Sequence, residues 1–466
     1  MQVYNSITKQ KEKFVTLEPN NVKMYVCGPT VYDNLHIGNA RPLVVFDTIR
    51  RFLEYIGYTV THVQNFTDID DKIISRANEN GVTTEDLTKK YIEEALIDMN
   101  GLNLLPYANS PKVTEEMTEI IEMIKILVKK GNAYISDGNV YFYTPSFLDY
   151  GLLKNVKQKN MQSRLEEDHL KKHPSDFTLW KTKKQDETHF DSPWSEGRPG
   201  WHIECSAIIK KYLGDTIDIH GGGYDLLFPH HENEIAQSVC ANDAPLARYF
   251  IHNGFINIDS EKMSKSSGNF FIIRDLAEQY GYNTLRFFLL SSHYRSAINY
   301  SKESIESSKA GLERIKKCLE NFDFLLKNNL LEKISNIEKN TWYKKDFIKL
   351  FDDSMKDDFN TSNAISVIFD MVRFANQNIN RSSSIEFITI IKTQLKNFLD
   401  ILGVKIEHTK KNETKDKQIK YLIEKRQKAK DNKNFDLADH IREQVISMGV
   451  VLEDTQSGTR WKYLDE

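Results

Sequence analysis

Four residues suited to chemistry lie close together near the N-terminus: Cys27, His36, Gly38 and Asn39. A short β-like run precedes them, and an amphipathic helical pattern with Pro42 in its first turn follows. A second β-like run comes next, which predicts a βαβ unit. In such units ligands bind at the carboxyl ends of the strands, and anions bind at the helix N-terminus. We therefore expect these residues to face a ligand.

A second group has the side chains of a metal site. His230 and Glu234 are four residues apart in an apparent helix, so they share one face. A histidine and a carboxylate on one face can bind zinc, and Cys27 and Cys205 are thiols near predicted strand ends. Such a pair is more often a surface hydrogen bond, and single cysteines are more often buried apolar residues. His231 also lies within reach of Glu234, so spacing alone does not choose between the histidines.

Three further segments are weaker candidates for ligand contacts. Gly221–Gly223 predicts a turn whose backbone can pass close to a ligand, although most glycine turns are only tight turns. Lys262–Ser266 has the composition of a solvated basic surface loop. The acidic segment Asn65–Lys72 predicts a helix start with Thr67 or Asp68 as its N-cap.

The elements that must position these residues fall into several parts. A chain of 466 residues predicts about three domains. A parallel-sheet pattern is interrupted by short strands and charged residues, resumes, and becomes mainly helical from about Thr284. The predicted fold class is α/β: a Rossmann-type parallel-sheet domain with an insertion, then a helical region and a small C-terminal domain. The predicted boundaries are 1–115 and 198–300 for the sheet domain, 116–197 for the insertion, 301–405 for the helical region, and 406–466 for a linker and C-terminal domain.

Composition excludes several classes of protein. The net charge of −3 gives no global nucleic-acid signal, so any such surface is local. Four cysteines in so long a chain favour reduced thiols over a disulfide framework. Neither a signal peptide nor an apolar run of membrane-spanning length is visible. We expect a cytoplasmic monomer with no membrane partner.

Several motifs together resemble one known family. The stretch Cys27–Asn39 resembles the HIGH signature of class I aminoacyl-tRNA synthetases, and Lys262–Ser266 matches their KMSKS loop letter for letter. Gly200–Cys205 and Phe228–Glu234 resemble the cysteine-specific branch of that family. The similarity runs nearly end to end. It includes Met355–Thr361 and Phe435–Arg442.

The resemblance implies a zinc ion, one per chain, bound by Cys27, Cys205, His230 and Glu234, and so favours His230 over His231. In that family the metal holds the sulfur of the substrate cysteine. An ordinary pocket separates substrates that differ by one methylene by only about 10- to 200-fold. A soft thiolate binds zinc far better than a hydroxyl does, so the metal could replace an editing domain. We expect Glu234 to lengthen or shift when the substrate adds a fifth ligand.

The implied reaction joins cysteine to ATP, giving cysteinyl-adenylate and pyrophosphate, and then transfers cysteine to the 3′ end of tRNA-Cys. Mg²⁺ is expected with the ATP. His36, Lys262 and Lys265 are the expected catalytic residues, because the family uses them on the phosphates. The implied ATP contacts are Pro29, Thr30, His36, Gly38, Asn39, Gly222, Gly223, Asp225 and Lys265. The implied pocket around the substrate cysteine consists of Thr67, Trp201 and His220.

One position departs from the family pattern, and two other functions compete. Asn39 stands where the signature ends in histidine, so its own role is open. A ligase that joins cysteine to an amino sugar would share the catalytic half but would not need the helical and basic C-terminal part. A silent RNA-binding relative is disfavoured by the intact Lys262–Ser266 loop.

The C-terminal part carries the expected tRNA contacts. The family reads the anticodon with the helical region near 340–405. Residues 405–433 hold eleven Lys or Arg against five Asp or Glu, and within them 408–417 is predicted as a linker. A charged run of this kind is usually a solvated helix face, but in this context we expect contacts with tRNA phosphates.

Overall fold

The structure is a computed structural model that describes residues 1–154, 169–184, 187–258, 261–262, 270–406, 413–455 and 458–463. The chain forms two compact units. The first comprises residues 1–317, 343–373 and 392–405, and the second comprises 318–342, 374–391 and 406–466. Among the described residues, no helix is both long and apolar enough to cross a membrane.

A four-stranded parallel sheet organises the first unit. Its strands lie in the order β10 (Ala247–Asn253), β9 (Ile217–Gly223), β3 (Asn21–Val26) and β4 (Thr59–Gln64). The register places Val26 beside both Gln64 and Gly221, so the carboxyl ends of the strands meet at one edge. The chain leaves β3 towards β4 on one side and returns as β9 on the other. Such a switch point is where parallel sheets bind ligands.

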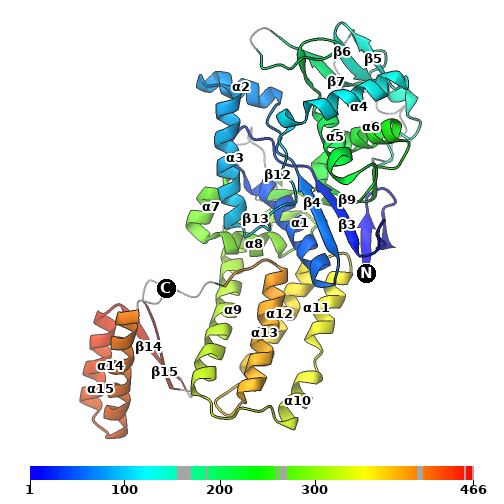
Figure 1. Ribbon diagram of the computed structural model, residues 1–466. Coiled ribbons are helices and arrows are strands. Elements are labelled where there is room, and N and C mark those ends of the chain that lie inside the picture. The colour runs from blue at the N-terminus through cyan, green and yellow to red at the C-terminus, as the bar shows by residue number, and fades with distance from the viewer. Residues whose placement is uncertain are drawn as a thin grey trace. The chain divides into compact units, whose positions relative to one another are not determined.

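The helix α1 (Ile37–Tyr55) covers this sheet and contacts β4, β9 and β10 (Figure 1). It begins earlier than predicted: His36 is its N-cap, so Gly38 and Asn39 lie in the first turn and Pro42 lies inside the helix. The helix ends at Tyr55, and Gly57 follows with a positive φ. The βαβ unit therefore has the predicted order, with a shifted helix start.

The three adjacent glycines do not form the predicted turn. Gly221–Gly223 are the last residues of β9, and the whole strand is buried. A Cβ at Gly221 would lie 2.3 Å from the ring of Phe46, and one at Gly222 would lie 2.9 Å from the ring of His231. These positions are glycine because neighbouring side chains fill the space, not because the chain reverses there.

The acidic segment caps its helix with a different residue from those predicted. Helix α2 (Asp71–Asn80) begins after Asp70, whose carboxylate accepts a hydrogen bond from a backbone N–H of the first turn at 2.9 Å. The prediction that Thr67 or Asp68 is the N-cap was therefore wrong. Asp68 instead accepts hydrogen bonds from the backbone and hydroxyl of Thr114.

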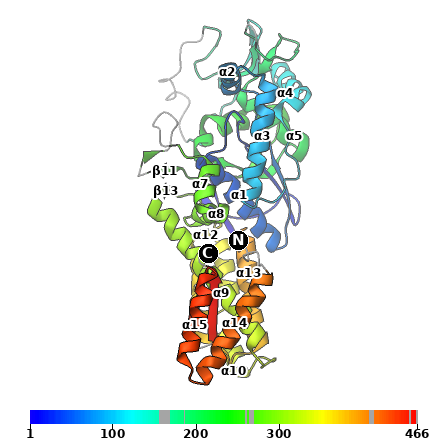
Figure 2. The same cartoon turned by 90° about the vertical axis from the view of Figure 1, so that its left-hand side faces the viewer.

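The segment between β4 and β9 contains an antiparallel sheet with helices around it. Short strands were predicted in this segment, and β5 (Ala133–Ser136), β6 (Asn139–Phe142), β7 (Phe177–Thr182) and β8 (Gly197–Pro199) form the sheet in the order β5-β6-β7-β8. Figure 1 shows this sheet with helices beside it, and Figure 2 shows α7 (Ile273–Tyr280) and α8 (Tyr282–Leu290) next to α1. The helices of the segment are α2, α3 (Thr84–Gly101), α4 (Met117–Lys129) and α5 (Trp201–Leu213).

The chain after β9 first returns to the sheet and then becomes helical, as predicted. A turn at Leu227–His231 leads into α6 (Glu232–Asn242). After β10, a small sheet has the order β12-β11-β13. The remaining elements of this part are β11 (Ile256–Ile258), β12 (Glu261–Lys262), α7 (Ile273–Tyr280), α8 (Tyr282–Leu290) and β13 (Ile298–Tyr300). The N-terminal hairpin is β1 (Gln2–Asn5) and β2 (Gln10–Lys13).

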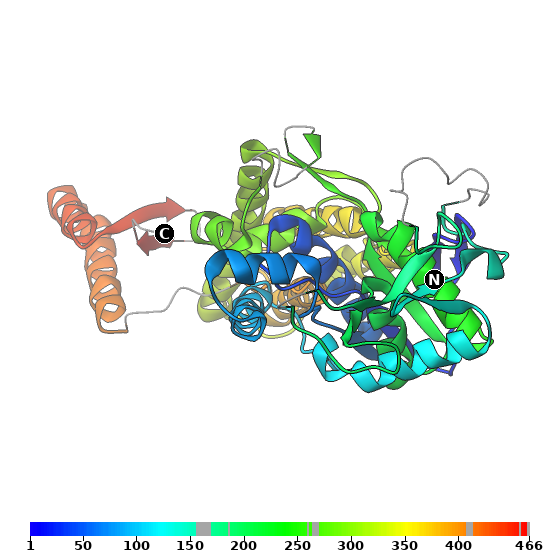
Figure 3. The same cartoon turned by 90° about the horizontal axis from the view of Figure 1, so that it is seen from above.

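The helices that follow β13 are α9 (Lys302–Asn328), α10 (Asn336–Tyr343), α11 (Phe347–Lys356), α12 (Thr361–Asn378) and α13 (Ile385–Ile401). At the C-terminus, α14 (Glu413–Asp431) and α15 (Phe435–Ser447) pack together, and α15 packs on the hairpin of β14 (Val450–Thr455) and β15 (Gly458–Tyr463), drawn in orange and red in Figure 3. Residues 413–417 are helical, so that part of the predicted linker was wrong, and 408–412 lie outside the described residues.

Candidate metal and nucleotide site

A cavity of about 330 Å³ opens at the carboxyl ends of the parallel strands. Cys27 follows β3, and Gln64 and Asn253 end β4 and β10. Of the predicted ATP contacts, Gly222 does not line the cavity, and Lys265 lies outside the described residues. The predicted contacts that do line it are Pro29, Thr30, His36, Gly38, Asn39, Gly223 and Asp225.

His36 and Asn39 form a reciprocal pair at the start of α1. The His36 Nδ1 atom accepts a hydrogen bond from the backbone N–H of Asn39, and the Asn39 side-chain oxygen accepts one from the backbone N–H of His36, each at 3.2 Å. This is a capping box, which satisfies two helix-end donors. Because Nδ1 is an acceptor, the neutral ring carries its proton on Nε2. The structure thus shows a positioning contact for Asn39.

The four predicted metal ligands meet beside this cavity. One ligand atom from each of Cys27, Cys205, His230 and Glu234 lies within 4.8 Å of the others. Glu234 Oε1 is 3.0 Å from His230 Nε2 and 3.4 Å from Cys27 Sγ, and Cys205 Sγ is 3.6 Å from His230 Nε2. Tetrahedral zinc ligands are separated by roughly 3.3–3.8 Å, so the group needs little movement to hold the ion.

The charges of the cluster also fit a divalent cation. Burial raises the pKa of the Cys27 thiol, whereas a hydrogen bond from Cys27 lowers the pKa of Cys205 to about 6. Burial opposes the charge of His230, but Glu234 and Cys205 raise its pKa to about 10. Burial likewise opposes the charge of Glu234, but His220 and His230 hold its pKa well below the usual range. Thiols and an imidazolium of this kind lose protons when they bind a metal ion.

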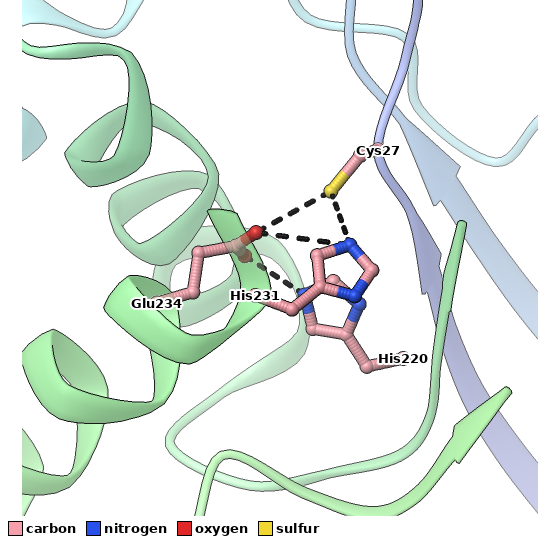
Figure 4. Close-up of side chains that lie close together, drawn as sticks. All are labelled: Cys27, His220, His231 and Glu234. Atoms are coloured by element: carbon pink, nitrogen blue, oxygen red, sulfur yellow. Dashed lines mark hydrogen bonds and ion pairs between the residues drawn. The ribbon is translucent and has the colours of Figure 1, made fainter. Parts of the chain in front are cut away.

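A second group of four residues shares two members with the first and also has metal-binding geometry. Figure 4 shows these side chains: Cys27, His220, His231 and Glu234. His231 Nε2 lies 4.0 Å from Glu234 Oε1, which is farther than the 3.0 Å of His230. The other nitrogen of His231 lies 2.8 Å from His252 Nε2, and His252 Nδ1 lies 2.8 Å from the Ser6 hydroxyl. His231 is thus held from behind by a chain of hydrogen bonds.

The three residues predicted for the substrate pocket have different surroundings. Trp201 is 39% exposed, lines the 330 Å³ cavity and stacks on His230 at 4.3 Å between ring centroids. His220 is buried, and its Nε2 atom lies 2.8 Å from Glu234. Thr67 is buried, and its backbone pairs with the loop after Cys27 through Pro29 and Val31. Only Trp201 reaches the cavity surface, and the other two support its walls.

A larger cavity of about 840 Å³ lies on the other side of Trp201, between the sheet domain and the antiparallel strands. Asp71 on its wall is paired with Lys181 at 2.7 Å and with Arg198. Glu204 is buried on the same wall, and its Oε2 atom has no hydrogen-bond partner among the described residues. The lining contains rings, cationic side chains and carboxyl groups: Tyr150, Phe177, Trp201 and Phe228; Lys154, Lys171, Lys181 and Arg198; Asp70, Asp71, Asp176 and Glu204.

The sequence prediction missed several residues around the site. Gln64 and Asn253 line the smaller cavity, and the rule that strand ends carry ligands could have identified both. His202, whose Nδ1 atom lies 2.9 Å from His230 Nδ1, gives no comparable signal in the sequence. For Lys262 the structure describes the backbone, as the end of β12.

The family comparisons agree with this arrangement. Residues 13–310 match the tRNA synthetases class I (C) catalytic domain, and residues 350–407 match the DALR domain. The chain is 51% identical over 467 residues to the cysteine–tRNA ligase of Clostridioides difficile (strain 630), with 99% of this chain and all of that protein covered. It is 50% identical over 470 residues to that of Lachnoclostridium phytofermentans, with the same coverage.

Solved structures with the same fold are more distant in sequence. A Mycobacterium tuberculosis methionyl-tRNA synthetase in complex with methionyl-adenylate has a TM-score of 0.62 at 16% identity, covering 82% of this chain and 89% of that chain. An arginyl-tRNA synthetase from Campylobacter jejuni has a TM-score of 0.58 at 12% identity, covering 85% and 95%. At these identities the similarity shows the fold alone, and it confirms the predicted α/β class with its parallel sheet.

Proposed function

Because the chain belongs to the cysteine–tRNA ligase family, we propose that it activates cysteine with ATP and transfers it to the 3′ end of tRNA-Cys. The observation that carries the cysteine specificity is the buried cluster of Cys27, Cys205, His230 and Glu234 beside the smaller cavity. Its two thiols and imidazole are the donors that zinc prefers, and its charges suit a dication.

We assign the zinc ligands to this set of four. When bound, zinc would supply a Lewis acid that binds the thiolate of the substrate cysteine. A serine hydroxyl has a far higher pKa and would bind the metal much more weakly. Trp201, stacked on His230, forms the wall between the ligands and the larger cavity. His220 and Thr67 hold Glu234 and the Cys27 loop in place from inside the core.

In the activation step the cysteine carboxylate attacks the α-phosphate of ATP, and pyrophosphate leaves with Mg²⁺. His36 lies at the N-terminus of α1, where the helix favours phosphate. Its Nε2–H donates to a phosphate oxygen, while Asn39 fixes the ring through Nδ1. Asp225 on the cavity wall accepts hydrogen bonds from ribose hydroxyls. Lys262 and Lys265 are assigned to the pyrophosphate by their match to the family's loop.

In the transfer step a hydroxyl of the terminal tRNA ribose attacks the carbonyl carbon of the adenylate. An ester bond forms, the acyl–phosphate bond breaks, and AMP leaves with the bonding electrons while the hydroxyl proton passes to its phosphate or to water. The 840 Å³ cavity is the proposed place for the terminal nucleoside, because it adjoins the smaller cavity at Trp201. Its rings suit base stacking, and its balanced charges suit a nucleoside better than a polyphosphate.

The rest of the chain receives proposals of the same kind. Helices within the segment that matches the DALR domain bind the anticodon arm, and basic faces of α14 contact tRNA phosphates. These roles are assigned to the parts predicted from the sequence: the two halves of the sheet domain, the insertion, the helical region and the C-terminal domain with its linker. The protein works as a cytoplasmic monomer. Size-exclusion chromatography with light scattering would test the monomeric state.

The central test is the choice between cysteine and serine. Cysteine-dependent ATP–pyrophosphate exchange is expected to exceed serine-dependent exchange by more than ~200-fold, the upper range for a pocket without a metal. The measurement compares kcat/KM for the two amino acids in the metal-loaded protein. Comparable rates would refute selection by the cluster. Exchange with cysteine but no charging of a tRNA-Cys transcript would favour the amino-sugar ligase.

The proposed nucleoside cavity predicts a variant that separates the two steps. Glu204→Gln keeps the shape of the side chain but replaces the carboxyl group, whose Oε2 atom has no hydrogen-bond partner among the described residues. We expect transfer from preformed adenylate to slow roughly 10-fold, the effect of one lost hydrogen bond, with exchange unchanged. Glu116→Gln, a buried carboxyl outside the cavity, is the control for folding. Equal transfer rates for both variants would place the nucleoside elsewhere.

A further inference from the structure

Arg41 is fully buried in α1, two residues after Asn39. Its Nη1 atom donates hydrogen bonds to the carbonyl oxygens of Gly254 at 2.8 Å and Phe255 at 2.6 Å. Its Nη2 atom donates to the carbonyl of Ser296 at 2.5 Å and reaches those of residues 293 and 294 at 3.5 and 3.3 Å. One guanidinium thus joins α1 to two separate segments.

Both segments lead to parts of the nucleotide site. Gly254 and Phe255 line the 330 Å³ cavity and are followed by β11. Ser296 precedes β13, which pairs in parallel with β11 from Ile298 beside Ile256. The same β11 pairs with β12, whose last residue, Lys262, is the first residue of the Lys262–Ser266 loop. Arg41 therefore stands at the point where the cavity wall and the base of that loop are both attached to α1.

This contact needs arginine in particular. Carbonyl oxygens that converge in the core repel one another and lose their hydrogen bonds to water, so they require hydrogen-bond donors from the protein. The two segments are in close backbone contact, since a Cβ at Gly254 would lie 2.6 Å from the Ser296 oxygen. Arginine supplies several donors in a rigid fork, and a lysine does not.

The charge of Arg41 has no counter-ion among the described side chains. No carboxylate of the described residues forms an ion pair with Arg41. Burial lowers the pKa of Arg41 to about 10, so the guanidinium is still protonated at neutral pH. A buried cation without a carboxylate is costly to keep. The carbonyl oxygens of the two segments are its compensation, which ties their positions to that of α1.

We propose that Arg41 is a positioning residue for ATP, which holds the cavity wall at Gly254–Phe255 and the origin of the Lys262–Ser266 loop against α1. This inference rests on the proposed function, because it assigns the cavity to ATP. Arg41 lies behind the wall, so it acts through the backbone of the two segments and not by touching the nucleotide.

The test compares two fully buried arginines of the full-length protein. Arg41→Lys keeps the charge but loses the fork, and KM for ATP in cysteine-dependent exchange is expected to rise ~10-fold or more, the effect of losing charge-assisted hydrogen bonds. KM for cysteine and the metal content stay unchanged. Arg286→Lys is the control, because Arg286 donates to the carbonyls of Leu102 and Leu402 and to the Asp47 carboxylate, none of which lines the cavity. It should lower Tm and leave KM for ATP unchanged.

Two further measurements keep the result interpretable. Arg41→Ala should regain ATP affinity in the presence of methylguanidinium, which can supply donors to the same carbonyl oxygens. Calorimetric ATP binding to Arg41→Lys tests the inference even if cysteine-dependent exchange is absent from the wild type, an outcome that would refute the proposed function alone. Equal Tm losses in Arg41→Lys and Arg286→Lys with unchanged ATP affinity would overturn the positioning role.

Discussion

Replacing Cys205 with serine is expected to lower both the affinity for zinc and the rate of cysteine activation, each by roughly 1,000-fold or more. Loss of residues that only support metal ligands costs about 10- to 100-fold, and loss of a thiolate ligand should exceed that. The Cys205 sulfur is buried and lies 3.6 Å from His230 Nε2. Serine fits the space, but its hydroxyl does not ionise at neutral pH, so it leaves the cluster without a soft anionic donor.

The measurement for Cys205→Ser is zinc content by mass spectrometry of the metal, with cysteine-dependent exchange on the same sample. Cys240→Ser is the matched control, because Cys240 lies in α6 outside both groups of possible ligands. The control should retain one zinc per chain and the wild-type exchange rate. Retained zinc with unchanged activity in Cys205→Ser would remove Cys205 from the site.

The second large effect should distinguish two adjacent histidines. His230→Ala is expected to lose zinc affinity by ~1,000-fold, again because a ligand is lost, whereas His231→Ala should keep one zinc per chain. The reason is geometric: His230 Nε2 is 3.0 Å from Glu234 Oε1, and His231 Nε2 is 4.0 Å away. The rear nitrogens do not separate the two residues, because that of His230 lies 2.9 Å from His202 and that of His231 lies 2.8 Å from His252.

These two variants control for each other. Both histidines are buried to within 1% exposure, so each alanine leaves a cavity of the same size in the same part of the core. Similar Tm losses are therefore expected, and only zinc titration should separate the variants. The opposite outcome, with zinc lost from His231→Ala and kept in His230→Ala, would assign the metal to the group of Figure 4.

Much of the fold follows from local patterns in the sequence. The order of strand, helix and strand around Cys27, the short strands β5 and β6, and the helical region after Thr284 were all predicted, because alternating and helical apolar spacing is a local signal. The start of α1 was missed for an equally physical reason. His36 and Asn39 cap each other through side-chain and backbone hydrogen bonds, which hydrophobic spacing does not report.

Other errors came from partners that are distant in the sequence. Gly221 and Gly222 look like a turn until the rings of Phe46 and His231 are placed over them. Asp70 rather than Thr67 caps α2, because α2 begins at Asp71, while the backbone of Thr67, four residues earlier, pairs with the loop after Cys27. In each case tertiary contacts overrode a sound local preference.

The sequence by itself determined the family resemblance, the types of side chain available for zinc and ATP, and their location at strand ends. Only the tertiary structure decided that Cys27 Sγ and Glu234 Oε1, 207 residues apart, lie at 3.4 Å, and that two groups of ligands compete for one place. It alone showed the larger cavity beyond Trp201 and the hold of Arg41 on two backbone segments. Spacing along a chain fixes which residues share one helix or strand, whereas their convergence depends on how separate elements pack.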